Sequence, residues 1–413
     1  MTDRVAPPAN IDPMDLVDGS RFAARGYPHD VWTQLRAEAP VCWFEPEGWT
    51  PFWAVTRHAD IQLVAKQPTR WSNEHGLIIM PQGAPIQPSD MVVTLDPPRH
   101  GPMRGVAIRR FTPRAVRDRH AEIERITTRI LDDVHAEALD EFDFVEKIAA
   151  PLPIAVISWI LGVPSTDWQL LFRWTNEVIG KDDPEFRRPG ESPGQTLRRA
   201  RGELHAYLNE LIAARRDDPG DDIISHLIAA EIDGRPLTPQ QLLNYAELMV
   251  EAGNETTRNA ISGGLLAFSE HPDQWERLQA QPDLLPSAVE EILRWVSPII
   301  HFIRYTVVDS EIHGVPIPAG DNVAVFWASG NRDETVFEDP FAFRIDRTPN
   351  PHLAFGFGEH FCMGAHLARV ELETIFRHLL DRLEWFELAG PVERLSSNVN
   401  GGIKHLPVRA GIR

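Results

Sequence analysis

The feature that most constrains the fold of this chain is one long helical stretch. Residues 240–271 run with almost no interruption, about three times the length of a usual helix in a globular protein. Shorter helical patterns cover residues 30–39, 99–110, 113–135, 145–161, 167–180, 196–216 and 286–295. Strands and helices do not alternate as in βαβ units, which argues against a doubly wound fold. The sequence therefore predicts a mainly α protein with small peripheral β-sheets.

Extended segments are few and short. Residues 41–44 and 52–55 flank the turn cluster Glu45-Pro46-Glu47-Gly48, which predicts a hairpin. Residues 303–308, 312–317 and 322–327 are also expected to be extended. Residues 71–91 are irregular and rich in Gly and Pro, and a loop of this length is often a functional lid. Residues 181–194 are expected to form a loop between helices.

Charge and composition exclude several classes of protein. The 41 Lys and Arg against 60 Asp and Glu give a net charge of −19, which disfavours nucleic acid and anionic membrane as partners. No apolar run approaches a membrane span, and the first residues contain no signal core, so we expect a cytoplasmic protein. The two cysteines, far apart in sequence, suggest no disulfide framework.

One of these cysteines has an unusual context. Glycines around it allow tight turns and a close backbone approach to a ligand, and an aromatic ring is placed to pack on a planar face. A helical pattern begins just after Gly364, so the sulfur precedes a helix N-terminus, which stabilises a thiolate. Such a thiolate can be an axial ligand of haem iron. The segment is Phe355-Gly356-Phe357-Gly358-Glu359-His360-Phe361-Cys362-Met363-Gly364.

The two cysteines also admit other interpretations. Cys42 lies among apolar residues and is expected to be a buried small hydrophobe. Neither the C-x-x-C of a zinc site nor the C-x-x-C-H of a c-type haem occurs. A cysteine hydrolase, with a His and an Asn or Asp converging on the sulfur, stays open on sequence grounds.

Two further segments admit both a structural and a functional interpretation. Ala252-Gly253-Asn254-Glu255-Thr256-Thr257 interrupts the long helix with poor helix formers. Its Thr hydroxyls can bond to carbonyls one turn earlier, and a locally opened helix there could hold water. Taken alone, a Thr-rich turn that merely packs is the simpler interpretation. Glu291 and Arg294 lie three apart on one helix face, which suits a surface pair or, given the apolar neighbours, a buried one.

The chain resembles the cytochrome P-450 family, the haem-thiolate monooxygenases. Phe355-x-x-Gly358-x-His360-x-Cys362-x-Gly364 matches the haem-binding signature of that family at every fixed position. Three further motifs follow the family's order, so the resemblance covers nearly the whole chain. It implies one domain over residues 1–413, the cytochrome P-450 fold with a long central helix over the haem, and heme b (iron protoporphyrin IX) as cofactor.

The resemblance also implies roles for individual residues. Cys362 is the metal ligand, Thr256 positions dioxygen and its protons, and Glu255 connects them to bulk water. Glu291, Arg294 and Arg347 form a structural network, the last from Pro340-x-x-Phe343-x-x-x-Arg347. Ala252 and Gly253 leave room for oxygen and substrate. The remaining cofactor-binding residues are His100, Arg104, Arg304, His352, Phe355, Gly356, His360 and Gly364.

The implied reaction is monooxygenation with dioxygen as co-substrate. No flavin or iron–sulfur signature is present, so the two electrons are expected from a ferredoxin and a ferredoxin reductase, and ultimately from NAD(P)H. Candidates for a cationic docking patch are Arg104, Arg109, Arg110, Arg114 and Arg369, although these arginines are equally suited to solvent or to the haem propionates.

The substrate is expected to be a hydrophobic small molecule. The predicted pocket residues are Ile78, Ile79, Val92, Met249, Ile299, Ile300 and Val399. Residues 397–408 resemble bacterial members acting on steroids, branched lipids and terpenoids. His301 and Asn400 add a polar contact or are satisfied by nearby backbone. The alternatives are a peroxide-driven peroxygenase, a haem-thiolate isomerase and a non-catalytic haem sensor or carrier.

Overall fold

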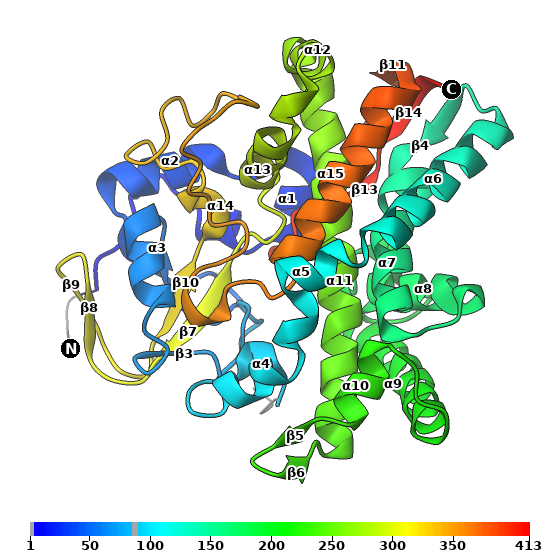
Figure 1. Cartoon of the computed structure of the whole chain (residues 1–413). Helices are drawn as coiled ribbons and strands as arrows, with labels where there is room; N and C mark the ends of the chain where they lie inside the picture. The colour runs from blue at the N-terminus through cyan, green and yellow to red at the C-terminus, as the bar shows by residue number, and fades with distance from the viewer. Residues whose placement is uncertain (1–3, 85–89) are drawn as a thin grey trace. The chain divides into compact units, whose positions relative to one another are not determined.

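The computed structural model describes residues 4–84 and 90–413, which fold as two compact units built from separate stretches of the chain. Unit 1 comprises Met1–His100, Glu290–Cys362 and Ser396–Gly401. Unit 2 comprises Gly101–Val289, Met363–Leu395 and Gly402–Arg413. Helices dominate and the sheets are small, as predicted (Figure 1).

A five-stranded sheet, in the order β1-β2-β10-β7-β3, organises unit 1. β1 and β2 pair antiparallel from Val41↔Val55 to Phe44↔Phe52, which confirms the predicted hairpin. The strands are β1 (Val41–Phe44), β2 (Phe52–Val55), β3 (Trp71–Ser72), β7 (Phe302–Thr306) and β10 (Asn322–Val325), with β8 (Ser310–Ile312) and β9 (Val315–Ile317) as a separate hairpin.

Both faces of this sheet are covered by helices. Alternate residues of a strand point to opposite sides, so neighbouring residues of β2 pack against different helices. Phe44 and Phe52 pack on the side of α1 (Gly19–Arg25) and α2 (His29–Glu38). Trp53 and Val55 pack on the other side, with α3 (His58–Ala65). β2 is therefore buried along its whole length, which explains its uninterrupted apolar sequence. The short α14 (Trp327–Gly330) follows β10.

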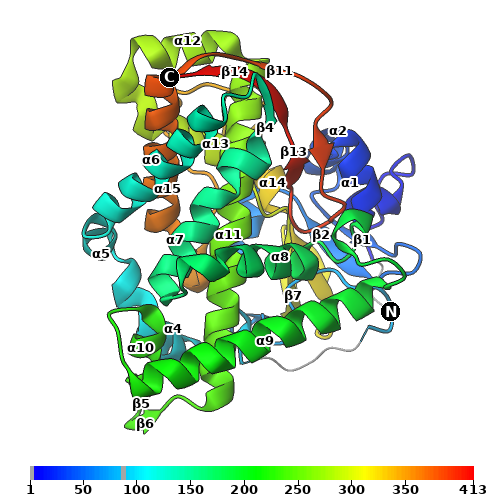
Figure 2. The same ribbon diagram turned by 90° about the vertical axis from the view of Figure 1, so that its right-hand side faces the viewer.

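The long helix predicted at 240–271 is α11 (Pro239–Glu270), the central element of unit 2. It begins with a capping box, in which Thr238 Oγ1 accepts from the Gln241 N–H at 3.2 Å and the Gln241 side chain accepts from the Thr238 N–H at 2.9 Å. Pro239 occupies the first turn, where its missing N–H costs nothing. Other helices of unit 2 flank α11 on several sides (Figure 2).

Unit 2 holds most of the helices among the described residues. Unit 2 contains α4 (His100–Ile108, whose first residue belongs to unit 1), α5 (Pro113–Arg117), α6 (His120–Glu137), α7 (Pro151–Leu161), α8 (Trp168–Ile179), α9 (Pro193–Asp217), α10 (Ile223–Ile228), α12 (Pro272–Ala280) and α15 (Ala365–Arg382). α13 (Leu285–Val296) begins in unit 2 and ends in unit 1. Within the described ranges, no helix has both the length and the apolar character needed to cross a membrane.

Three small sheets complete unit 2. The largest has the order β11-β14-β4, from β4 (Glu141–Asp143), β11 (Leu383–Leu388) and β14 (Pro407–Ile412). β12 (Glu393–Arg394) pairs with β13 (Ile403–His405), and β5 (Glu231–Ile232) pairs with β6 (Arg235–Pro236). None of these strands was predicted from the sequence.

Several predicted boundaries were wrong. The helix expected at 113–135 is two helices, α5 and α6, and the strand expected at 312–317 is the β8–β9 hairpin. The strand expected at 322–327 ends at Val325, and Trp327 starts α14. The loop expected at 181–194 contains a 3₁₀ turn, Pro184–Phe186, and α9 begins within it. Residues 85–89 of the irregular segment 71–91 lie outside the described residues.

Candidate active site

The Cys362 loop is shaped by two glycines with positive φ. Gly356 has φ +70° and Gly358 has φ +76°, a region that other residues rarely adopt. A Cβ at Gly358 would lie 2.4 Å from the backbone oxygen of Ala65, whereas at Gly356 no atom comes nearer than 4.0 Å. Gly358 thus permits close packing, and Gly356 leaves one side of the loop open.

The cysteine ends this loop in a defined position. The Cys362 N–H donates to Phe355 O at 2.9 Å, which closes the loop, and Cys362 is exposed. Phe355 and Phe361 meet edge to face with ring centres 6.1 Å apart. α15 begins at Ala365, three residues after the sulfur, as predicted. Gly364 has φ −83°, so the backbone there does not itself require glycine.

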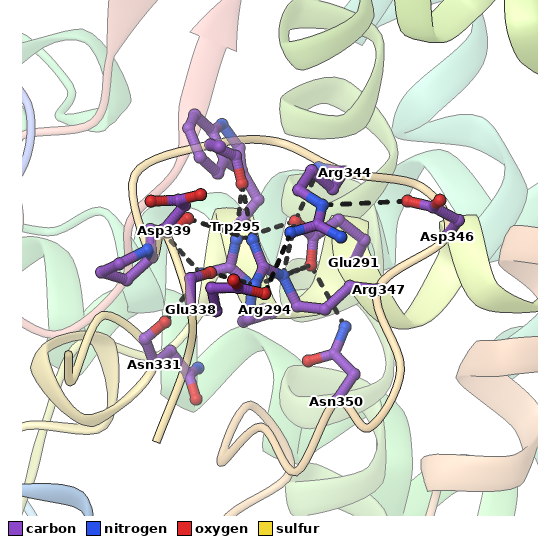
Figure 3. A network of polar contacts seen from close by, with 12 residues as sticks. Glu291, Arg294, Trp295, Asn331, Glu338, Asp339, Arg344, Asp346, Arg347 and Asn350 are labelled. Atoms are coloured by element: carbon purple, nitrogen blue, oxygen red, sulfur yellow. Dashed lines mark hydrogen bonds and ion pairs between the residues drawn. The ribbon is translucent and has the colours of Figure 1, made fainter. Parts of the chain in front are cut away.

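The cysteine loop is supported by a buried ion-pair network around Glu291 (Figure 3). Arg294 donates from Nε to Oε2 and from Nη2 to Oε1 of Glu291, both at 2.8 Å. Arg347 Nε lies 3.1 Å from Oε2. The Arg344 backbone N–H and the Asn350 side-chain amide also donate, at 2.9 and 3.1 Å. The predicted contacts among Glu291, Arg294 and Arg347 are confirmed.

The network reaches the loop through Asn331. Arg294 Nη1 donates to the backbone oxygen of Asn331 at 2.9 Å. The side-chain oxygen of Asn331 accepts from the Leu353 N–H at 2.6 Å, two residues before Phe355. Neither Asn331 nor Asn350 could be predicted as part of the site, because a lone Asn carries no spacing pattern.

Two of the predicted cofactor-binding histidines meet in unit 1. The rings of His100 and His360 lie 4.1 Å apart between centres, and His100 is buried. His352 is different. Its Nδ1 accepts from the Ala354 N–H at 3.2 Å, so Nε2 carries the proton and donates to Glu290 at 3.1 Å. His352 is therefore engaged within unit 1 on both ring nitrogens.

Arg304 is a buried cation. Burial lowers the pKa of its guanidinium to about 10, and the charge of Asp96 opposes this lowering. Its Nη1 donates to the neighbouring Ile303 backbone oxygen at 2.8 Å, and no carboxylate pairs with it in the described ranges 4–84 and 90–413. A buried guanidinium in this state suits an incoming carboxylate, so Arg304 fits the propionate of a haem.

In unit 2, the segment 252–257 stays α-helical within α11, so the locally opened helix expected there does not occur. The predicted back-bond is present, because Thr256 Oγ1 donates to Ala252 O at 3.0 Å. Ala252 is exposed and Thr256 half-buried, although most neighbouring residues of the helix are buried. These two residues, four apart, leave a strip of the helix open.

Gly253 has a purpose other than the one predicted. A Cβ there would lie 2.8 Å from Cγ1 of Ile157 in α7, so the missing side chain allows α7 to approach α11. It does not leave space for oxygen or substrate on that side. Arg104, also in unit 2, lies near Tyr245 of α11, since its charge opposes the burial that raises the pKa of Tyr245 to about 12.

Glu255 is buried beside Thr256. Burial raises the pKa of its carboxyl, and the charge of Arg258 opposes that rise. Arg258 forms an ion pair with Glu255 Oε1 and donates to the Asn176 side chain at 2.8 Å. Oε2 of Glu255 has no hydrogen-bond partner within the described part of the chain. The carboxyl is thus positioned by one oxygen and available at the other.

The predicted pocket residues divide into two groups. Ile79 and Ile300, predicted as pocket wall, are buried in the hydrophobic core of unit 1. Val92 and Met249 are also buried. The residues of the set that keep partial exposure are Ile78, Ile299 and Val399. The structure brings residues 299–300 and 399–400 together. The Ile300 N–H donates to Val399 O at 2.8 Å, and Ile299 forms an isolated β-bridge with Asn400.

His301 has the structural role that the sequence left open. Its Nε2 accepts from the Ile79 N–H at 3.1 Å and its Nδ1 donates to Asn398 O at 2.9 Å. Burial lowers the pKa of His301 to about 4, so the ring is neutral at physiological pH. It therefore fixes the segment before Met80 and has no nitrogen left for a substrate.

The chain matches the family model for Cytochrome P450 over residues 184–404. It is 38% identical over 401 residues to a Linalool 8-monooxygenase of Pseudomonas putida, covering 92% of this chain and 95% of the relative. It is 36% identical over 422 residues to a Steroid C26-monooxygenase of Mycobacterium tuberculosis, covering 97% and 94%. A solved structure, the Mycobacterium marinum cytochrome P450 CYP268A2 in complex with pseudoionone, superposes with a TM-score of 0.90 at 35% identity, covering 98% and 99%.

These similarities extend over nearly the full length of the chain and of each relative. They agree with the cysteine loop, the Glu291 network and the mainly helical fold. They also imply the use of haem iron and dioxygen. The chain belongs to the cytochrome P450 family and is a monooxygenase of that family.

Proposed function

We propose that this protein inserts one oxygen atom of dioxygen into a C–H bond of a terpenoid, a steroid or a branched lipid, with residues 1–413 acting as one domain. The observation that carries the proposal is the exposed Cys362 at the end of a loop fixed by Gly356 and Gly358. The linalool and steroid named for two relatives, and the pseudoionone bound in the solved structure, support this substrate class.

The chain's own residues would hold heme b. Cys362 would supply its sulfur as the metal ligand, and Phe355 would pack against the ring. Arg304, which is buried without a carboxylate partner in the described ranges, would bind a propionate, with His100 and His360 beside it. When bound, the haem supplies the redox chemistry that activates dioxygen.

Thr256 and Glu255 would manage protons. Thr256 presents its hydroxyl from the open strip of α11, held by the bond to Ala252 O. Glu255 is held by Arg258 through Oε1 and would transfer a proton at Oε2. Its raised pKa favours a carboxyl that can donate. Ile78, Ile299 and Val399 would contact the hydrophobic substrate.

Electrons would come from a ferredoxin and its reductase, and ultimately from NAD(P)H. Arg109 and Arg114 support this, because both are exposed and neither has an ion-pair partner among the described residues. Arg110 is less suitable, since it already pairs with Asp221 at 2.9 Å. Such arginines would attract an acidic donor, and the effect should weaken with salt. The cytoplasmic location stays a prediction.

The first experiment tests the metal ligand. Cys362→Ala should abolish the thiolate-type carbonyl spectrum of the reduced protein, whereas Cys42→Ala, at a buried cysteine, should keep it. An unchanged carbonyl spectrum in Cys362→Ala would refute the proposal.

Thr256→Ala should divert electrons into hydrogen peroxide, and Thr256→Ser, which retains the hydroxyl, should restore product yield.

The second experiment identifies the substrate. A panel of terpenoids, steroids and branched lipids is screened by the shift of the haem Soret band, and products are then identified. Turnover with dioxygen and an electron donor supports the monooxygenase. Turnover with peroxide alone would favour the peroxygenase, and no turnover against the whole panel would favour the haem sensor.

A further inference from the structure

Three glutamates lie one turn apart on α11. Glu247, Glu251 and Glu255 are spaced by four residues, and side chains at this spacing lie above one another along a helix. Glu247 and Glu255 are almost fully buried, and the Glu251 side chain is 18% exposed. Burying a carboxylate is costly unless it is paired, so this glutamate stripe needs a physical reason.

α9 brings two basic side chains to one end of the glutamate stripe, where it crosses α11 (Figure 2). Arg201 Nε lies 2.7 Å from Glu247 Oε1, and His205 Nε2 lies 2.8 Å from Glu247 Oε2. Arg201 Nη2 is 4.0 Å from Glu251 Oε1. Arg201 and His205 are 41% and 27% exposed, so this end of the stripe is in contact with water.

The surroundings of the three carboxyls differ. Burial, and then the carboxylate of Glu247, raise the pKa of Glu251 to about 8, against the charge of Arg201. Burial would also raise the pKa of Glu247, but His205 and Arg201 outweigh it and lower that pKa. Burial raises the pKa of Glu255, opposed by Arg258. At neutral pH a charged acceptor, Glu247, therefore lies beside a protonated donor, Glu251.

Three oxygens inside the stripe have no hydrogen-bond partner among residues 4–84 and 90–413. They are Oε1 of Glu247, which has only its ion pair with Arg201, Oε1 of Glu251 and Oε2 of Glu255. Buried polar oxygens are as a rule satisfied by protein or ordered water. One helical turn rises about 5.4 Å, close to the span of two hydrogen bonds through one water of about 2.8 Å each. The spacing of one helical turn is therefore compatible with a water bridge between Glu251 and Glu255.

A purely structural role needs only part of this arrangement. Glu247 alone ties α9 to α11 through Arg201 and His205, and Arg258 alone holds Glu255. Glu251 adds little to either tie, because its nearest cation lies 4.0 Å away. Glu251 also places its carboxyl beside the Glu247 carboxylate. A Gln at position 251 would have nearly the same shape and would not add a second acidic group there. The two ties therefore do not account for an ionisable group at this position.

We infer that Glu247 and Glu251 form a proton relay that connects water at His205 to Glu255. The inference rests on the proposed function, in which Glu255 and Thr256 deliver protons during dioxygen activation. That reaction consumes one C–H bond, one dioxygen, two electrons and two protons, and yields one hydroxyl group and one water. For each proton that leaves Glu255, one enters from water at His205, so the relay returns to its starting state. Glu247 and Glu251 are positioning residues, since they act through Glu255.

The test uses Glu251→Gln in the haem-loaded protein. This variant should form several-fold less product per electron and show a larger solvent deuterium isotope effect, while the substrate Kd stays at the parent value. Glu251→Asp should recover most of the yield, because it restores an ionisable group. The matched control is Glu210→Gln, at an exposed glutamate of α9, which should equal the parent.

Two further readouts separate a relay from a structural role. In the parent, product yield per electron should fall as pH rises through about 8, and this dependence should disappear in Glu251→Gln. An infrared titration of the resting protein needs no turnover. The part of the protonated-carboxyl band that titrates near pH 8 in the parent should be missing in Glu251→Gln, whereas the band of the buried Glu371, whose pKa burial also raises, should remain in both proteins.

The outcomes distinguish this inference from the proposed function. If Glu247→Gln and Glu251→Gln match the parent while Glu255→Gln loses product yield, the relay is overturned and the proposed function stands. If Glu255→Gln also matches the parent, the proposed role of Glu255 is overturned. Should Glu251→Gln fail to fold, the infrared titration is made on Glu371→Gln, which removes the band of the other buried carboxyl, and the absence of a component that titrates near pH 8 overturns the relay.

Discussion

At the scale of single residues, unit 1 depends on one buried anion. Glu291 is fully buried and accepts hydrogen bonds from two arginines, one backbone N–H and one amide. Its charge compensates Arg294 and Arg347, which are also buried. Removing one partner of such a group leaves the others uncompensated in a medium that solvates charge poorly.

Glu291→Gln should therefore destabilise the protein by about 3–5 kcal/mol. The loss is measured by urea unfolding followed by circular dichroism. Glu338→Gln is the matched control, because Glu338 is 85% exposed and its side chain pairs only loosely with Arg344. A Glu291→Gln protein as stable as the control would show that the buried charges are compensated in another way.

The Glu291–Arg294–Arg347 contacts could be predicted because each residue belongs to a motif with fixed spacing. The roles of Ile79 and Ile300 could not, since an apolar residue in a predicted loop suits a pocket and a core equally. Contacts with segments far away in the sequence place both residues in the core. The Ile300 N–H donates to Val399 O, and the Ile79 N–H donates to His301 Nε2. The contact of His352 could not be predicted either, because its partner Glu290 lies 62 residues earlier in the sequence.

At the scale of elements, the cysteine loop offers a comparison between two glycines. Both Gly356 and Gly358 have positive φ, so alanine at either position should cost about 1–2 kcal/mol in backbone strain. Only at Gly358 does the added methyl meet backbone, 2.4 Å from Ala65 O. Gly358→Ala should therefore lose more stability than Gly356→Ala and displace the loop.

Urea unfolding and the haem Soret band of each purified variant test this comparison. Gly358→Ala should retain less haem per protein than Gly356→Ala, since the loop that carries Cys362 has to move. Equal haem content and equal stability in the two variants would mean that the contact with Ala65 relaxes without moving the loop.

Elements whose signal is local were predicted well. α11 has a capping box at one end and Pro272 just after the other, and its predicted range differed by one residue at each end. The break between α5 and α6 could not be predicted because residues 117–120, Arg-Asp-Arg-His, contain no Gly or Pro to mark it. The β8–β9 turn has a local sequence signal in Gly314. His313 and Gly314 both have positive φ, as a two-residue hairpin turn requires.

At the scale of the whole molecule, the two units share the chain. Each is built from three separate stretches, so neither unit corresponds to one continuous segment. This arrangement could not be predicted from composition, because no linker marks the changes of unit. It follows that a fragment cut at any single point would lack part of at least one unit.

Within unit 2, His405 connects distant stretches through its charge. Its Nδ1 lies 2.5 Å from Asp143 Oδ2 and its Nε2 lies 2.8 Å from Glu185 Oε1. Burial alone would lower the pKa of His405, but the bonds to the two carboxylates outweigh it and raise that pKa. The folded state therefore holds the proton more tightly than the unfolded state does.

The stability that His405 contributes should be complete below its ordinary pKa of about 6.5. It should be lost as pH rises through the raised value of the folded state. Because the side chain is 37% exposed, the effect should stay below about 1 kcal/mol. Urea unfolding at several pH values should show His405→Gln less stable than the parent in acid and equal to it in base. His366→Gln, at an exposed histidine, should show no such trend; a constant difference for His405→Gln would rule out the charge.

The contrast between the two sulfurs has a practical consequence for anyone who purifies this protein. The thiol of Cys42 is fully buried, and burial raises its pKa to about 12. A maleimide added near neutral pH should therefore not react with Cys42. Only position 362 would then take the label, and only in molecules whose sulfur is not already bonded to iron. The fraction of a preparation that shows the mass of one maleimide would therefore give the fraction of molecules without haem.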